Sequence, residues 1–127
     1  MGLYGDLNGF ALSRRKSVMD PNEVYTARFT TAGGSNPTVD AIKTRGVASV
    51  LRTGTGVITI TLPFKLRHSD VQVSVVSFPA GAIAHLPTVQ HTEGAKIVTV
   101  TTVTLAGNVA ADTTNLVLNV RIEGRAG

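Results

Sequence analysis

Hydrophobic and polar residues alternate along most of the chain, and the alternation is clearest near its centre. In residues 57–62 the side chains of Ile58, Ile60 and Leu62 share one parity, while valine and threonine occupy the other. A period of two is typical of a strand with one face in a core. A second β-branched run, residues 47–52, is separated from the first by Thr53-Gly54-Thr55-Gly56. Glycines allow the positive φ of a tight reversal, so the pattern predicts a β-hairpin.

The same alternation predicts three further strands, over residues 24–31, 70–78 and 116–122. We expect their inward rows to be Tyr25, Ala27 and Phe29; Val71, Val73 and Val75; and Leu116, Leu118, Val120 and Ile122. β-branched residues suit a half-buried pleated surface, and they dominate these segments.

Other segments give mixed signals. Residues 32–37 are typical of a loop, and residues 38–45 could be an extended crossover or a short edge piece. Residues 82–90 resemble a weak strand interrupted by Pro87, which favours an edge or a loop. In residues 96–105 the valines change parity, which predicts a β-bulge near Thr101 and Thr102. We expect residues 123–127 to form a short tail.

About seven strands spaced roughly 8–12 residues apart, without a helix, predict an all-β fold. The expected architecture is a single β-sandwich or a jelly-roll or barrel-like domain over residues 23–127, preceded by an extended N-terminal arm at residues 1–22. The arm lacks the alternation, so it is either a frayed terminus or a segment that orders against a neighbour. Its candidate partner-binding residues are Leu3, Tyr4, Phe10, Leu12, Arg14, Arg15 and Lys16.

Composition narrows the function classes. The 127 residues suit one core, and cysteine is absent, which excludes disulfides and thiolate metal sites. No segment approaches the roughly 20 apolar residues of a membrane-spanning helix, so we expect no membrane association. The net charge of +4 is modest, and aromatic residues are not interleaved with basic ones. Specific nucleic-acid binding is therefore not expected.

Candidate catalytic and metal sites lack the necessary spacing. The three histidines, His68, His85 and His91, form no close pair on one element. Ser69 lies between His68 and Asp70, but adjacent residues of a strand cannot face one another. The glycine-containing turns lack the Gly-Lys-Ser/Thr ending of a phosphate-binding loop. We therefore expect no enzymatic activity, no catalytic residues, no metal and no cofactor.

Residues 45–63, RGVASVLRTGTGVITITLP, resemble the central hairpin of small virion proteins from tailed bacteriophages. The end of the chain is similar too, with a Gly/Ala/Asp loop at residues 106–115 before a hydrophobic strand. The resemblance implies a non-enzymatic capsid decoration (cement) protein that binds the major capsid protein or other virion subunits. It implies a homo-oligomer, with a trimer favoured, and location in the virion after assembly in the host cytoplasm.

Two other virion roles stay open. The chain could be a tail- or fibre-associated module that binds glycans on the host surface, although an aromatic content of 5% provides few rings to stack on sugars. It could instead be a minor coat subunit whose Arg14, Arg15 and Lys16 contact packaged DNA, which would make binding strongly salt-dependent.

Overall fold

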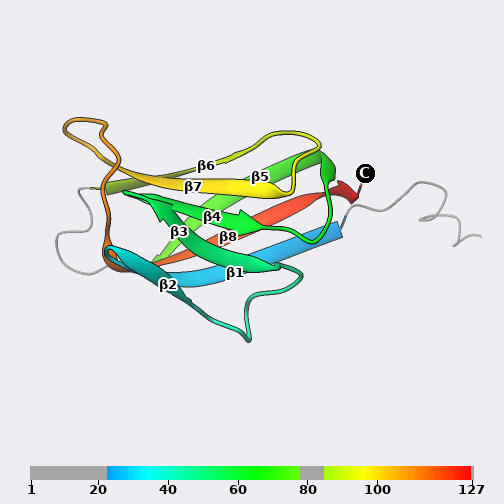
Figure 1. Cartoon of the computed structure of the whole chain (residues 1–127), viewed down its shortest axis with the longest axis horizontal. Helices are drawn as coiled ribbons and strands as arrows, with labels where there is room; N and C mark the ends of the chain where they lie inside the picture. Colours follow the sequence, from blue (N-terminus) through cyan, green and yellow to red (C-terminus); the bar gives the residue numbers. More distant parts are fainter. Residues whose placement is uncertain (1–22, 78–84, 127) are drawn as a thin grey trace, which may run out of the picture.

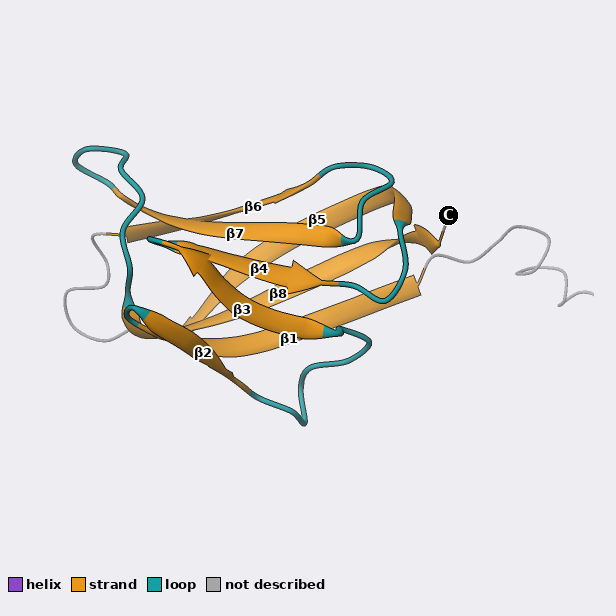
Figure 2. Cartoon of the chain, in the orientation of Figure 1, coloured by secondary structure: helices purple, strands orange, loops and turns teal. Residues whose placement is uncertain are grey.

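The structure, a computed structural model, describes residues 23–77 and 85–126, and these residues form eight strands and no helix (Figures 1 and 2). The strands are β1 (Glu23–Ala32), β2 (Ser35–Val39), β3 (Ser49–Gly54), β4 (Val57–Thr61), β5 (Leu66–Ser77), β6 (His85–His91), β7 (Ile97–Thr104) and β8 (Thr114–Ala126). The predicted arm, residues 1–22, lies outside the described residues.

The strands form two antiparallel sheets packed face to face (Figure 1). The first sheet has the order β2-β1-β8-β5, and the second has the order β3-β4-β7-β6. The prediction of an all-β fold is confirmed, and the two separate sheets correspond to the β-sandwich among the expected architectures.

The core lies between the two sheets and consists of the inward rows of their strands. In the first sheet the predicted inward residues of β1 and β8 are all buried, and Phe29, Leu118 and Ile122 are fully enclosed. In the second sheet Ile60 is also fully enclosed, and Val98 lies directly opposite it on β7. Because successive side chains of a strand point to opposite faces, the alternation in the sequence becomes the core of the sandwich.

The predicted central hairpin forms, but β3 runs on to Gly54 with a register shift after Arg52, so the turn is shorter than the predicted Thr53–Gly56. β3 and β4 pair from Ser49 with Thr61 to Gly54 with Val57, leaving a two-residue turn at Thr55 and Gly56. Gly56 has a φ of +69°, the conformation that glycine adopts without a steric penalty. The hairpin then places β4 beside β7, in the middle of its sheet.

One strand was missed by the sequence patterns. The structure has eight strands where about seven were predicted, because β2 forms within the stretch expected to be a loop and an ambiguous connection. β2 contains Pro37, which lacks a backbone N–H donor. The strand tolerates this proline because it is an edge strand, with β1 as its only neighbour among the described strands.

The predicted bulge in β7 is wrong. The pairing of β7 with β4 and with β6 is continuous, and Thr102 takes the inward position that follows Val98 and Val100. The buried Thr102 hydroxyl donates to the carbonyl oxygen of Ala111 at 2.7 Å, so its polar group is satisfied. A hydrogen-bonded threonine therefore continues the inward row, and Val103 faces outward.

Two strands also extend further than predicted. β5 begins at Leu66, which is fully buried, and β8 continues through the segment expected to be a tail to Ala126. The two extensions pair with each other, Leu66 opposite Ala126. At the other end of β5 the predicted inward residue Val75 is 41% exposed, so this end of the edge strand is only partly covered.

We expect Ile60→Ala to lower the free energy of unfolding by about 2–5 kcal/mol, because it removes fully enclosed methyl groups and leaves a cavity. Leu51→Ala on the outward face of the same hairpin should change it by about 0.5 kcal/mol. Urea unfolding followed by circular dichroism compares the two. Equal losses would contradict the assignment of the hairpin's inward face.

Candidate functional site

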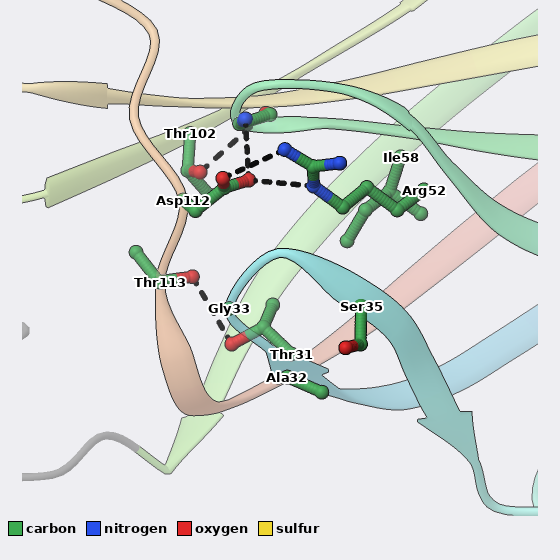
Figure 3. A pocket seen from close by; sticks show the side chains of 10 residues that line it. Thr31, Ala32, Gly33, Ser35, Arg52, Ile58, Thr102, Asp112 and Thr113 are labelled. Carbon is green, nitrogen blue, oxygen red and sulfur yellow. Dashed lines mark hydrogen bonds and ion pairs between the residues drawn. The ribbon is translucent and has the colours of Figure 1, made fainter.

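Residues 105–113 link β7 to β8 and cross one end of the sandwich, where they meet the β3–β4 turn (Figure 1). There Asp112 forms a bidentate ion pair with Arg52 of β3, through Nε–Oδ1 at 2.9 Å and Nη2–Oδ2 at 2.8 Å (Figure 3). The planar guanidinium matches the carboxylate geometry, which makes such pairs directional. The pair thus anchors the connection to the hairpin.

The hairpin turn supplies further contacts to the same connection and to β7. The Gly56 N–H donates to Asp112 Oδ1 at 2.8 Å, and the Gly56 carbonyl accepts from the Thr102 N–H at 2.9 Å. A Cβ on Gly56 would lie 2.6 Å from the Ala111 nitrogen. Glycine is therefore required twice at this position, for its positive φ and for the close approach of the connection.

The electrostatics of the pair follow from these contacts. The hydrogen bond from Arg52, together with the one from the Gly56 N–H, holds the pKa of Asp112 below its ordinary value of 3.8. The hydrogen bond to Asp112 raises the pKa of Arg52 in turn. The two side chains are 25% and 27% exposed, so solvent screens the interaction.

A small hollow lies beside the pair, between the two sheets. It is lined by Thr31, Ala32, Gly33, Ser35, Arg52, Gly56, Ile58, Thr102, Asp112 and Thr113 (Figure 3). About 10 Å³ is open to the centre of a water molecule, which is room for about one water. Organic ligands occupy pockets of roughly 300–1,000 Å³. The hollow is therefore too small for an organic ligand, and the contacts beside it hold residues 105–113 against the β3–β4 hairpin.

The structure brings together Ser69 and His91, a pair that the sequence pattern does not connect. Ser69 Oγ lies 2.5 Å from His91 Nδ1, while His91 Nε2 lies 3.0 Å from the Ala95 carbonyl oxygen. A carbonyl only accepts, so Nε2 carries the hydrogen and Nδ1 accepts from Ser69. In a catalytic triad a carboxylate occupies the carbonyl's position and stabilises the imidazolium. Here the contact joins edge strands of the two sheets.

The other histidines do not assemble a metal centre within the described part of the chain. His68 Nδ1 lies 3.7 Å from Glu93 Oε2 at an exposed position. Across residues 23–77 and 85–126, no three His, Cys, Asp or Glu side chains gather into a group that could hold a metal ion. The same residues include no helix long and apolar enough to cross a membrane.

The sequence-predicted contact residues Leu3, Tyr4, Phe10, Leu12, Arg14, Arg15 and Lys16 all lie outside the described residues. Among the described residues, the β3-β4-β7-β6 sheet (Figure 2) has an extended outward face, which we call the threonine face. Its residues are Ser49, Leu51, Thr53, Val57, Thr59, Thr61, Leu86, Thr88, Gln90, Ile97, Thr99, Thr101 and Val103.

The threonine face carries no charged side chain. Thr59 of β4 lies opposite Thr99 of β7, and the hydroxyls of Thr53 and Thr59 are 2.8 Å apart. Three aliphatic residues remain about half exposed among these hydroxyls, Leu51 at 47%, Leu86 at 50% and Ile97 at 49%.

The outward face of the other sheet has the opposite character. Arg28 of β1 donates to Asn119 of β8 at 3.1 Å, and Arg121 of β8 pairs with Glu123 at 3.0 Å. Asp70 of β5 lies directly opposite Glu123. The outward face of the β2-β1-β8-β5 sheet therefore resembles an ordinary solvated surface. The threonine face has the depletion of charge and the exposed aliphatic groups found at the centre of protein interfaces.

Comparison of the chain with protein-family models, curated proteins and solved structures found no match in any of the three.

We expect Gly56→Ala to be more destabilising than Gly94→Ala, although both glycines have positive φ. A Cβ at position 94 meets nothing within 4 Å, so that variant has only the backbone strain of about 1–2 kcal/mol. At position 56 the Cβ also collides with Ala111, which adds about 1–3 kcal/mol. Urea unfolding measures both, and equal losses would show that the connection does not pack on the turn.

The lowered pKa of Asp112 makes stability depend on pH. A carboxyl whose pKa is lower in the folded state stabilises the fold above its unfolded pKa, and this contribution is lost as pH falls through the folded value. We expect wild type to lose free energy of unfolding more steeply than Asp112→Asn below the ordinary value of 3.8. The asparagine can still accept from Gly56, so the comparison isolates the charge. Parallel pH profiles would contradict the role of the ion pair.

Proposed function

We propose that the chain is a non-enzymatic structural virion protein, a capsid decoration protein that binds the assembled lattice of the major capsid protein through its threonine face. The observation that carries the proposal is the absence of charge across this outward sheet face, together with its half-exposed Leu51, Leu86 and Ile97. The resemblance of residues 45–63 to virion proteins of tailed bacteriophages supplies the context.

An uncharged sheet face is suited to burial against another protein. Covering a lysine or glutamate removes a charge from water, which costs free energy unless a partner compensates. Threonine hydroxyls lose less on burial, because each can donate and accept one hydrogen bond with the opposing surface. Docking through the threonine face therefore requires no matched set of ion pairs on the lattice.

The size of the face suggests how such a protein would act. Four strands about 4.8 Å apart, with five or six residues at about 3.3 Å, give on the order of 300–400 Å² per copy. Stable pairwise complexes bury about 800 Å² per partner, so one copy would bind weakly by this face alone. Many copies held on one lattice can still bind firmly through multivalency. Because they bind only the assembled state, they stabilise it by mass action.

Leu51→Lys tests the proposal. It places a charge on the threonine face, in the edge strand β3, on a residue that is 47% exposed, so the domain should still fold. We expect at least a tenfold loss of binding to empty shells assembled from the major capsid protein of the same phage, measured by co-sedimentation. The reason is the cost of burying an unpaired ammonium group at the contact.

Val24→Lys is the matched control, because Val24 is also 47% exposed but lies on the charged face, opposite Glu123. It should sediment with the shells as wild type does. Loss of binding in both variants, or in neither, would exclude the threonine face as the contact. If wild type binds no shells but is retained by host glycans, the fibre-module alternative replaces the decoration role.

A further inference from the structure

The two sheets have four edge strands among the described residues, and three of them carry features that block pairing with another strand. β2 is only five residues long and contains Pro37, and β6 contains Pro87. On β3 the backbone N–H of Arg52 already donates to Asn36 Oδ1 at 3.0 Å. Prolines, short length and occupied backbone donors are the usual protection of sheet edges.

β5 is different. It is 12 residues long, contains no proline or lysine, and has β8 as its only neighbour among the described strands. Its register with β8 is continuous from Asp70 to Val75, and irregularities lie on both sides of this stretch. A regular edge strand presents a row of open N–H and C=O groups that can template another strand.

We propose that β5 is a self-association edge, at which the β5 strands of two copies of this chain pair antiparallel about a two-fold axis through Val73. Inward residues must meet inward residues, because a slip of one position would turn a hydrophobic row to solvent. A residue therefore pairs with its own counterpart at the axis. An axis at Val73 places two residues of the regular stretch on each side of it, so residues 71–75 of both copies pair.

This register is self-complementary. Val71 lies opposite Val75 of the second copy, Val73 lies opposite its own counterpart, and Gln72 lies opposite Ser74. The inward row becomes a run of β-branched pairs, and the paired residues 71–75 carry no charge. Val75, which is 41% exposed in one copy, gains a valine neighbour. The open backbone groups of both edges are satisfied at the same time.

A two-fold contact of this kind closes on itself, so it yields a dimer with one continuous eight-stranded sheet and does not propagate into fibres. The threonine face belongs to the other sheet and stays free in the dimer. The pairing therefore goes beyond the proposed decoration role, and either can fail without the other.

Two double variants of the full chain test the pairing. Gln72→Lys with Ser74→Lys places like charges opposite each other twice across the axis, whereas Gln72→Lys with Ser74→Glu places opposite charges there. We expect a dimer for wild type and for the Lys/Glu variant in light scattering after size exclusion. The Lys/Lys variant should dissociate at least tenfold more readily and elute as a monomer.

Hydrogen exchange on wild type provides a second readout that needs no variant. Protection of β5 amides between Val71 and Val75 should increase with protein concentration, while that of the β6 edge should not. A wild-type monomer at all accessible concentrations, or the trimer expected from the resemblance, would overturn the proposal. So would a Lys/Lys variant that remains dimeric, or concentration-independent exchange in β5.

Discussion

The structure depends on one constraint, that each sheet must bury its inward row against the inward row of the other. Neither sheet has a second hydrophobic face, so neither is stable without its partner. The central strands carry most of this burial, with Phe29, Leu118 and Ile60 fully enclosed between the sheets. Because the inward rows are buried in the core, contacts with other molecules can be made only by the outward rows and the sheet edges.

The ends of the sandwich need separate connections, since the core holds only the middle of each strand. At one end Asp112 joins residues 105–113 to the β3–β4 hairpin through Arg52 and Gly56. At the β5 and β6 edges Ser69 and His91 link the two sheets. Both contacts are polar, and in each of them a backbone group supplies a further hydrogen bond. Their geometry explains how the ends are held in place.

The two outward faces differ from each other, and so do the four edges. One face carries a network of charged side chains, and the threonine face carries none. Three edges carry protective features, whereas β5 keeps a regular stretch from Asp70 to Val75 and has β8 as its only neighbour among the described strands. The contact role that we propose needs selected surfaces of this kind. The proposed roles of the threonine face and of β5 assign one partner to each: the capsid lattice and a second copy of the chain.

The sequence by itself determined the class of fold and most of the core. A period of two needs only local geometry, so the inward rows of β1, β4 and β8 could be predicted residue by residue. The glycine turn of the hairpin was predictable for the same reason, because positive φ is a local property. Thr59 and Thr61 were predicted to lie on the face opposite the inward row of β4, but the meeting of threonines from four strands in one uncharged surface was not predicted.

Tertiary structure decided whatever depends on residues distant in the chain. Arg52 and Asp112 are 60 positions apart, and Ser69 and His91 are 22 apart, so no local pattern joins them. The predicted bulge near Thr102 was wrong because Thr102 points inward. Its hydroxyl donates to the carbonyl oxygen of Ala111, which lies in the loop after β7. β2 and the end of β8 form because neighbouring strands complete their hydrogen bonds. The order of the strands in a sheet depends on which of the possible strand pairings is most stable. The edge strands are therefore known only from the folded structure.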